Sequence, residues 1–121
     1  MRLAIGIGLN SKAQAAEIVA LVKASLAEAA LDTGAVALIA SAGRKGGNAP
    51  LKAAAAHFGV PLELVPDEDL ARIGVDQASA LAASRTGLES VAEAAARYFG
   101  PLLSGKRKSA NATCAIAELE P

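Results

Sequence analysis

The chain of 121 residues has few of the side chains that metal, disulfide and base-stacking chemistry require. It contains one cysteine, one histidine, one tyrosine, two phenylalanines and no tryptophan. A single cysteine excludes an internal disulfide and a cysteine-based zinc site, and we expect neither a metal nor a cofactor. The scarcity of aromatic rings leaves no platform on which the bases of a nucleic acid could stack.

Net charge and long apolar runs are also absent. Twelve Lys and Arg residues balance twelve Asp and Glu residues, so no overall field attracts nucleic acid. The apolar runs are shorter than the roughly 20 residues that a membrane-spanning helix needs, and the first residues lack the layout of a signal peptide. We therefore expect a cytoplasmic protein that has neither a nucleic-acid nor a membrane partner.

Alanine is abundant, and hydrophobic residues make up 53% of the chain. A chain of this length is predicted to form one domain, spanning residues 1–121, that buries about two thirds of its extended surface. Small side chains allow neighbouring layers of such a domain to pack closely.

Short apolar segments alternate with helical patterns along the chain. We predict strands over residues 2–8, 36–41 and 62–65, helices over 12–30, 49–58 and 90–99, a short helix over 77–83, and a final hairpin with arms from 102 and over 112–118. Asn48 is a predicted helix cap and Gly59 a predicted helix end, and the spacings Ser11–Gln14 and Ser90–Glu93 resemble capping boxes. This alternation predicts an α/β fold of three layers, α/β/α, with a mostly parallel (mixed) sheet of about five strands and a C-terminal hairpin.

The predicted topology gathers the segments that follow the strands at one edge of the sheet, where ligands usually bind. A right-handed crossover through residues 90–99 brings the tip of the hairpin to the same edge. The polar and basic residues expected there are Asn10, Ser11, Arg44, Lys45, Arg107 and Lys108. Basic side chains beside a helix N-terminus suit carboxylates or phosphates.

Two glycine-rich segments resemble nucleotide motifs without completing them. Gly6 and Gly8 begin a G-x-G-x-x-G pattern, but Ser11 occupies the position of its third glycine, and residues 43–48 lack the Gly-Lys-Ser/Thr ending of a P-loop. Close approach of a helix to the first strand is the simpler interpretation of Gly6 and Gly8. His57, next to Phe58 at a helix end, is more simply structural than a general base.

Two charged features have both a structural and a functional interpretation. Glu93 can bond back to the amide of its helix cap, or it can orient a water or a basic group beside a ligand. The run Lys106–Lys108 can be a solvated edge that discourages strand pairing, or it can bind an anion.

The chain resembles the CobE family of cobalamin biosynthesis, whose module also forms the C-terminal domain of CbiG proteins. The resemblance is carried by residues 90–96, 106–109 and 113–117, and it extends over Gly6-Ile7-Gly8, Lys45, Leu51, residues 59–62 and Gly87. Family members often have a basic stretch where this chain has residues 9–11, and a glutamate where it has Asn48.

The resemblance implies a role in construction of the corrin ring, where CbiG proteins open a lactone of a cobalt-precorrin and release acetaldehyde. Precorrins carry acetate and propionate groups that basic side chains and helix N-termini can bind. Our leading hypothesis is that the chain binds such an anionic tetrapyrrole. The predicted substrate-binding residues are Gly6, Gly8, Asn10, Ser11, Arg44, Lys45, Ser90, Glu93, Arg107, Lys108 and Ser109.

Two alternatives stay open at this point. In the first, the domain is itself a hydrolase of a precorrin lactone, with Glu93 or Lys45 in proton transfer. In the second, it docks on another enzyme of the cobalamin pathway. Whether the domain is catalytic is not decided by its residues.

Overall fold

A computed structural model of the chain describes residues 2–43, 48–66, 68–70, 72 and 87–119, with the backbone alone described for residues 87–90 and 104–106. Within these residues, five strands form one sheet: β1 (Leu3–Leu9), β2 (Val36–Ala42), β3 (Leu62–Val65), β4 (Leu102–Lys108) and β5 (Ala112–Glu118). The helices are α1 (Ala15–Glu28), the 3-10 turn η1 (Thr33–Ala35), α2 (Ala49–Phe58) and α4 (Gly87–Arg97). The predicted short helix over residues 77–83 lies outside the described residues.

The sheet is mixed, with the strand order β3-β2-β1-β5-β4. β1 pairs in parallel with β2, and β2 pairs in parallel with β3. β5 lies antiparallel between β1 and β4, so β4 runs in the direction of β1. The predicted α/β fold class and the antiparallel final strand are confirmed.

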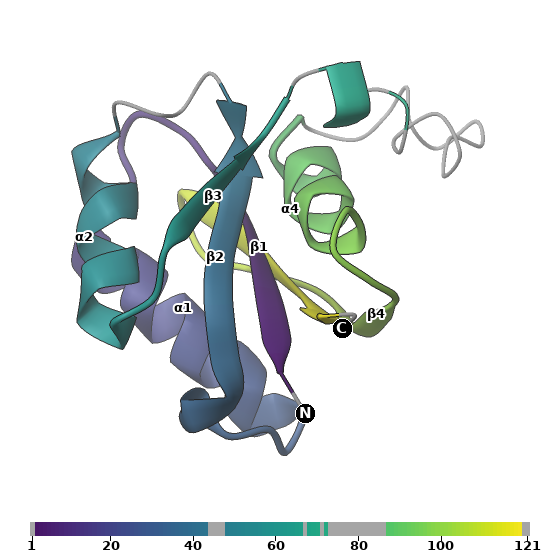
Figure 1. Ribbon diagram of the computed structural model, residues 1–121. Helices are drawn as coiled ribbons and strands as arrows, with labels where there is room; N and C mark the ends of the chain where they lie inside the picture. Colours follow the sequence, from purple (N-terminus) through teal and green to yellow (C-terminus); the bar gives the residue numbers. More distant parts are fainter. Residues whose placement is uncertain (1, 44–47, 67, 71, 73–86, 120–121) are drawn as a thin grey trace.

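Helices cover both faces of the sheet, as Figure 1 shows, with α1 and α2 on one side and α4 on the other. Alternate residues of β1 belong to the two cores that result. Leu3, Ile5 and Ile7 pack with the α1 and α2 side chains, whereas Ala4 packs with α4. This two-residue period is what a strand covered on both faces requires.

Gly6 lies beneath the backbone of α4. A Cβ atom added at Gly6 would stand 2.0 Å from the carbonyl oxygen of Ala92 and 2.7 Å from the amide nitrogen of Ala96. The helix can approach β1 so closely because it presents alanines, among them the fully buried Ala92, Ala95 and Ala96. Gly6 is therefore a packing residue, and the prediction that it contacts a substrate is wrong because α4 occupies that space.

The cap of α2 agrees with its prediction. Asn48 Oδ1 accepts a hydrogen bond of 2.8 Å from the amide of Leu51, and Gly59 ends the helix with a left-handed φ of 69°. Both residues supply what a helix terminus needs. Asn48 accepts a hydrogen bond from an amide that has no partner within the helix, and Gly59 adopts a positive φ without the steric penalty of a Cβ atom.

The two predicted capping boxes are wrong. α1 begins at Ala15 with Gln14 at the N-cap and no side-chain cap hydrogen bond, while Asn10 Oδ1 accepts from the amide of Lys12 at 2.8 Å. The Asn10 side chain thus stabilises a turn before the helix. α4 begins at Gly87, which places Ser90 inside the first turn of the helix.

The start of β1 and the end of β5 are neighbours in the sheet. Leu3 is paired with Glu118, and the amide of Leu119 donates a hydrogen bond of 2.8 Å to the carbonyl of Arg2. None of the helices within the described ranges is long and apolar enough to cross a membrane.

Cys114 is buried in β5. Burial raises the pKa of its thiol to about 11, against a smaller lowering effect of the Ser25 hydroxyl. Because the thiolate is the reactive form, we expect a thiol reagent at neutral pH to label the folded protein far more slowly than protein unfolded in urea. Equal labelling rates with and without urea would contradict this placement.

Candidate functional site

The strands β1, β2, β3 and β4 all end at one edge of the sheet, because they share a direction. The helix α2 begins at this edge, and the tip of the β4–β5 hairpin lies at it (Figure 1). We call this end of the sheet, where the carboxyl ends of β1 to β4 lie, the candidate edge. Its described residues are Asn10, Ser11, Lys12, Asn48 and Lys108–Asn111.

The hairpin tip is joined to the segment that follows β1. The amide of Asn10 donates to the carbonyl of Asn111 at 3.0 Å, and the Asn10 side-chain amide donates to Asn111 Oδ1 at 3.2 Å. These bonds connect residues that are 101 positions apart. They hold the exposed Lys108 at the same edge as the exposed Ser11 and Lys12, which confirms the predicted convergence for this part of the site.

Glu17, in the first turn of α1, anchors the tip from the side of the helix. One of its carboxylate oxygens accepts the hydroxyl of Ser109 and the amide of Asn111, the latter at 2.7 Å. The other oxygen accepts the Asn111 side-chain amide at 3.2 Å. A carboxylate with three donors from one turn fixes the position of that turn strongly, since hydrogen bonds to an ionised acceptor are the stronger kind.

These donors lower the pKa of Glu17 below the usual value of 4.5, with the Ser109 hydroxyl as the largest cause and the Asn111 amide as the next. Partial burial opposes the shift, and the backbone of Gln14 adds a smaller lowering effect. The Gln14 contribution is one half of a capping box, with Glu17 at the third helical position. A carboxylate held in its ionised form in this way serves as an anchor and is a poor proton acceptor.

We expect Glu17→Gln to lower the free energy of unfolding at pH 7 by about 1 kcal/mol, the usual net value of a lost hydrogen bond. Because the pKa of Glu17 is lower in the folded state, its stabilisation is present above the usual value of 4.5 and is lost as the pH falls through the folded pKa. Solvent screening keeps the effect small. Between neutral and acid pH, the parent protein should therefore lose more of its free energy of unfolding than Glu17→Gln does. Urea unfolding at the two pH values measures this difference.

The matched control is Glu63→Gln, which changes an exposed carboxylate on β3. It should change the free energy of unfolding at pH 7 much less than Glu17→Gln does. Parallel stability profiles for Glu17→Gln and the parent protein would contradict the anchoring role.

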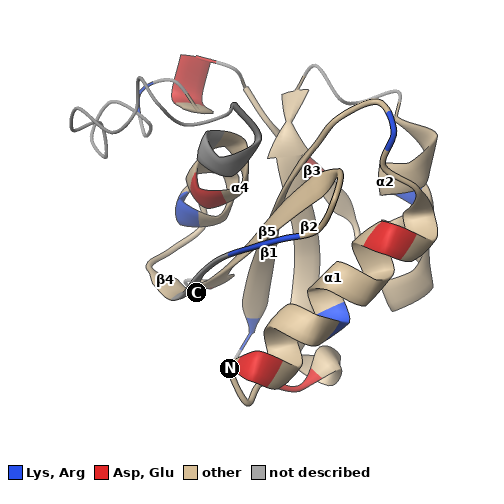
Figure 2. Ribbon diagram, turned by 180° about the vertical axis from the view of Figure 1, so that it is seen from behind, with Lys and Arg blue, Asp and Glu red and all other residues tan. Residues whose placement is uncertain are grey.

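Arg107 takes a different position from the predicted one. Its guanidinium pairs with Glu28 at 2.5 Å, with both side chains substantially exposed. Glu28 ends α1, about 16 Å along the helix axis from Glu17 at 1.5 Å per residue. Figure 2 shows the basic end of β4 beside α1. The Arg107 guanidinium is therefore paired with a carboxylate of the chain itself. An exposed ion pair of this kind opens readily, so that the guanidinium can bind solvent or a ligand.

The remaining predicted site residues lie elsewhere. Gly8 is buried in β1. Glu93 is half-buried on α4 and makes an interaction within the protein. The sheet separates α4 from α1, the helix that carries Glu17 (Figure 1). Ser90 lies in the same helix, whereas Arg44 and Lys45 fall outside the described residues.

Sequence reasoning missed Glu17 and the role of Asn111. An acidic residue in the first turn of a helix is a visible signal, but its partners Ser109 and Asn111 are 92 and 94 positions away. Nowhere in the described ranges do three or more His, Cys, Asp or Glu side chains come together as a metal site would require.

Comparison with known proteins gives one family match and several structural matches. The model of the family described as "Cobalamin synthesis G C-terminus" matches residues 3–117. No curated protein sequence matches the chain.

The solved structures include CobE, a protein from the cobalamin (vitamin B12) biosynthetic pathway, at 29% identity, with a TM-score of 0.81 over 98% of this chain and 91% of that one. Cobalamin biosynthesis protein ChiG from Agrobacterium tumefaciens is 29% identical, with a TM-score of 0.76 over 98% and 99% of the two chains. A putative cobalamin biosynthesis protein G homolog from Sulfolobus solfataricus is 25% identical, with a TM-score of 0.72, and this chain covers 38% of it.

Proposed function

From the premise that this chain belongs to the cobalamin synthesis G C-terminal family, we propose that it binds an anionic precorrin-type tetrapyrrole at the candidate edge. The observation that carries the proposal is the bonding of the hairpin tip to the segment after β1. This bonding presents Lys12 and Lys108 at one edge beside the hydroxyl and amide groups of Ser11 and Asn10.

The chemistry of this edge suits a ligand with several carboxylates. Lysine ammonium groups attract carboxylates without demanding one geometry, and exposed hydroxyl and amide groups donate further hydrogen bonds. The three-donor bonding of Glu17 keeps the tip in place before a ligand arrives, which reduces the entropy lost on binding. Arg107 adds a guanidinium that can leave the exposed Glu28 for a stronger, multivalent anion.

A spectroscopic titration of the protein with precorrin intermediates tests the proposal, because the macrocycle absorbs visible light and the protein does not. We expect saturable binding in the micromolar range. The same intermediates with their carboxylates converted to methyl esters are the matched control, and we expect them to bind much more weakly. Equal binding of acid and ester, or no binding of either, would overturn the proposal.

The hydrolase hypothesis makes a separate prediction that the same samples can test. Of its two candidate residues, Glu93 lies on α4, and Lys45 is outside the described residues. Release of acetaldehyde from a lactone-bearing intermediate, lost in Glu93→Gln, would favour hydrolysis over binding alone.

A further inference from the structure

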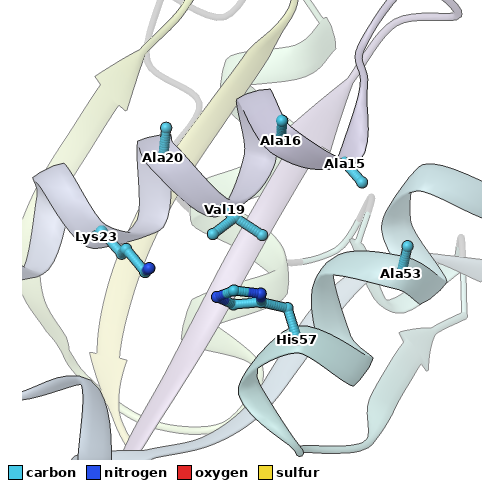
Figure 3. A pocket seen from close by; sticks show the side chains of 7 residues that line it. All are labelled: Ala15, Ala16, Val19, Ala20, Lys23, Ala53 and His57. Carbon is cyan, nitrogen blue, oxygen red and sulfur yellow. The ribbon is translucent and has the colours of Figure 1, made fainter.

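A hollow lies between α1 and α2, on the outer side of the layer that these helices form. Its volume is about 410 Å³, within the range of about 300–1,000 Å³ that small-molecule sites occupy. The lining residues are Ala15, Ala16, Val19, Ala20, Lys23, Ala53 and His57 (Figure 3). An adjoining hollow of about 340 Å³ shares Lys23 and His57 and adds Thr33, Gly34 and Phe58.

The polar groups of the hollow are two basic side chains from different helices. Figure 3 shows Lys23 of α1 and His57 of α2 reaching toward each other across it. Lys23 is exposed and makes no ion pair or hydrogen bond through its ammonium group with the described part of the chain. The described side-chain contact of His57 is an edge-on ring contact with Phe58, with centroids 5.2 Å apart.

No acidic side chain is among the described residues that line either hollow. Asp32, next to the second hollow in sequence, accepts the amide of Gly34. The two basic groups therefore face an apolar surface of alanine and valine without a neutralising partner. This arrangement favours a ligand that has an anionic head and an apolar body.

We infer that this hollow binds a small organic monocarboxylate, with the carboxylate between Lys23 and His57 and the apolar body against Val19, Ala20 and Ala53. The volume suits one aromatic or branched acid and is too small to enclose a tetrapyrrole. An apolar peptide helix is disfavoured, because it would remove water from Lys23 and His57 without pairing them. The inference is independent of the proposed function, whose site lies at the candidate edge.

His57 is the only histidine of the chain, so its ring signals in an NMR spectrum report on this hollow alone. The probe is 3-phenylpropionate, and its uncharged amide, 3-phenylpropanamide, is the matched ligand. We expect the acid to shift the His57 signals in a saturable manner at millimolar concentrations. The amide should shift them far less, since it cannot form the charge-assisted hydrogen bonds.

Lys23→Gln should weaken binding of 3-phenylpropionate about tenfold, the scale of losing a hydrogen bond to a charged group. Lys52→Gln, which changes an exposed lysine of α2 outside both hollows, is the matched control and should bind as the parent does. The variant Arg107→Ala, Lys108→Ala should also bind the probe normally.

Any one of these results would overturn the inference: no saturable shift, equal shifts by acid and amide, or equal weakening by Lys23→Gln and Lys52→Gln. Loss of the shift in Arg107→Ala, Lys108→Ala would also overturn it, since the probe would then bind at the candidate edge. Binding of a precorrin and binding of the probe are measured separately, so failure of one does not decide the other.

Discussion

Replacing Gly6 with alanine is expected to lower the free energy of unfolding by about 3 kcal/mol, the upper part of the range for overpacked cores. The added Cβ would stand 2.0 Å from the carbonyl oxygen of Ala92 and 2.7 Å from the amide nitrogen of Ala96. Both atoms belong to the backbone of α4, so no rotation of a side chain can relieve the contact. The helix must move away from β1 and lose its close packing.

Urea unfolding followed by circular dichroism measures this effect, with Gly34→Ala as the matched control. A Cβ at Gly34 would meet its nearest atom, Asp32 Oδ2, at an ordinary 3.5 Å, so this substitution should change stability by only about 0.5 kcal/mol. Similar stabilities of Gly6→Ala and Gly34→Ala would show that α4 does not pack against β1 as described.

The second large effect is expected at the hairpin tip. The variant Arg107→Ala, Lys108→Ala should weaken binding of a precorrin intermediate by about a hundredfold, as expected for two charge-assisted contacts of about 1.5 kcal/mol each. The fold should persist, because Arg107 is substantially exposed and Lys108 is exposed. The spectroscopic titration described above measures the change, and circular dichroism checks the fold.

Glu28→Ala is the control that separates the two roles of Arg107. It removes the same 2.5 Å ion pair as Arg107→Ala, but it leaves the guanidinium available. If Arg107 binds the ligand, Glu28→Ala should bind as well as the parent or better. If Glu28→Ala weakens binding as much as Arg107→Ala does, the role of Arg107 is purely structural. If the variant Arg107→Ala, Lys108→Ala binds as the parent does, the hairpin tip is not part of the binding site.

Local patterns predicted most of the fold. β3 and α2 have the predicted bounds, because Asn48, Gly59 and Pro61 mark the helix ends and strand start within a few residues. The starts of α1 and α4 were predicted wrongly, because the capping-box spacings at Ser11–Gln14 and Ser90–Glu93 do not mark the helix ends, which lie at Ala15 and Gly87. Asn10 Oδ1 instead accepts a hydrogen bond from the amide of Lys12, and α1 begins only at Ala15.

The site was less predictable, since its contacts connect distant parts of the chain. Topology placed the hairpin tip beside the segment after β1, but no local pattern links Glu17 to Asn111 or Arg107 to Glu28. The glycine-rich strand was compatible with approach by either a helix or a ligand. Only the position of α4 decides this, and it leaves no room for a ligand at Gly6.

The adjacent ends of β1 and β5 bear on how this domain can be built into a larger protein. Arg2 and Leu119 are hydrogen-bonded neighbours, at the edge of the sheet opposite the candidate edge. A second domain fused to either end would therefore be attached at nearly the same point, away from the hairpin tip. For the same reason, a short peptide linker between these ends would permit a circular permutation that preserves all five strands.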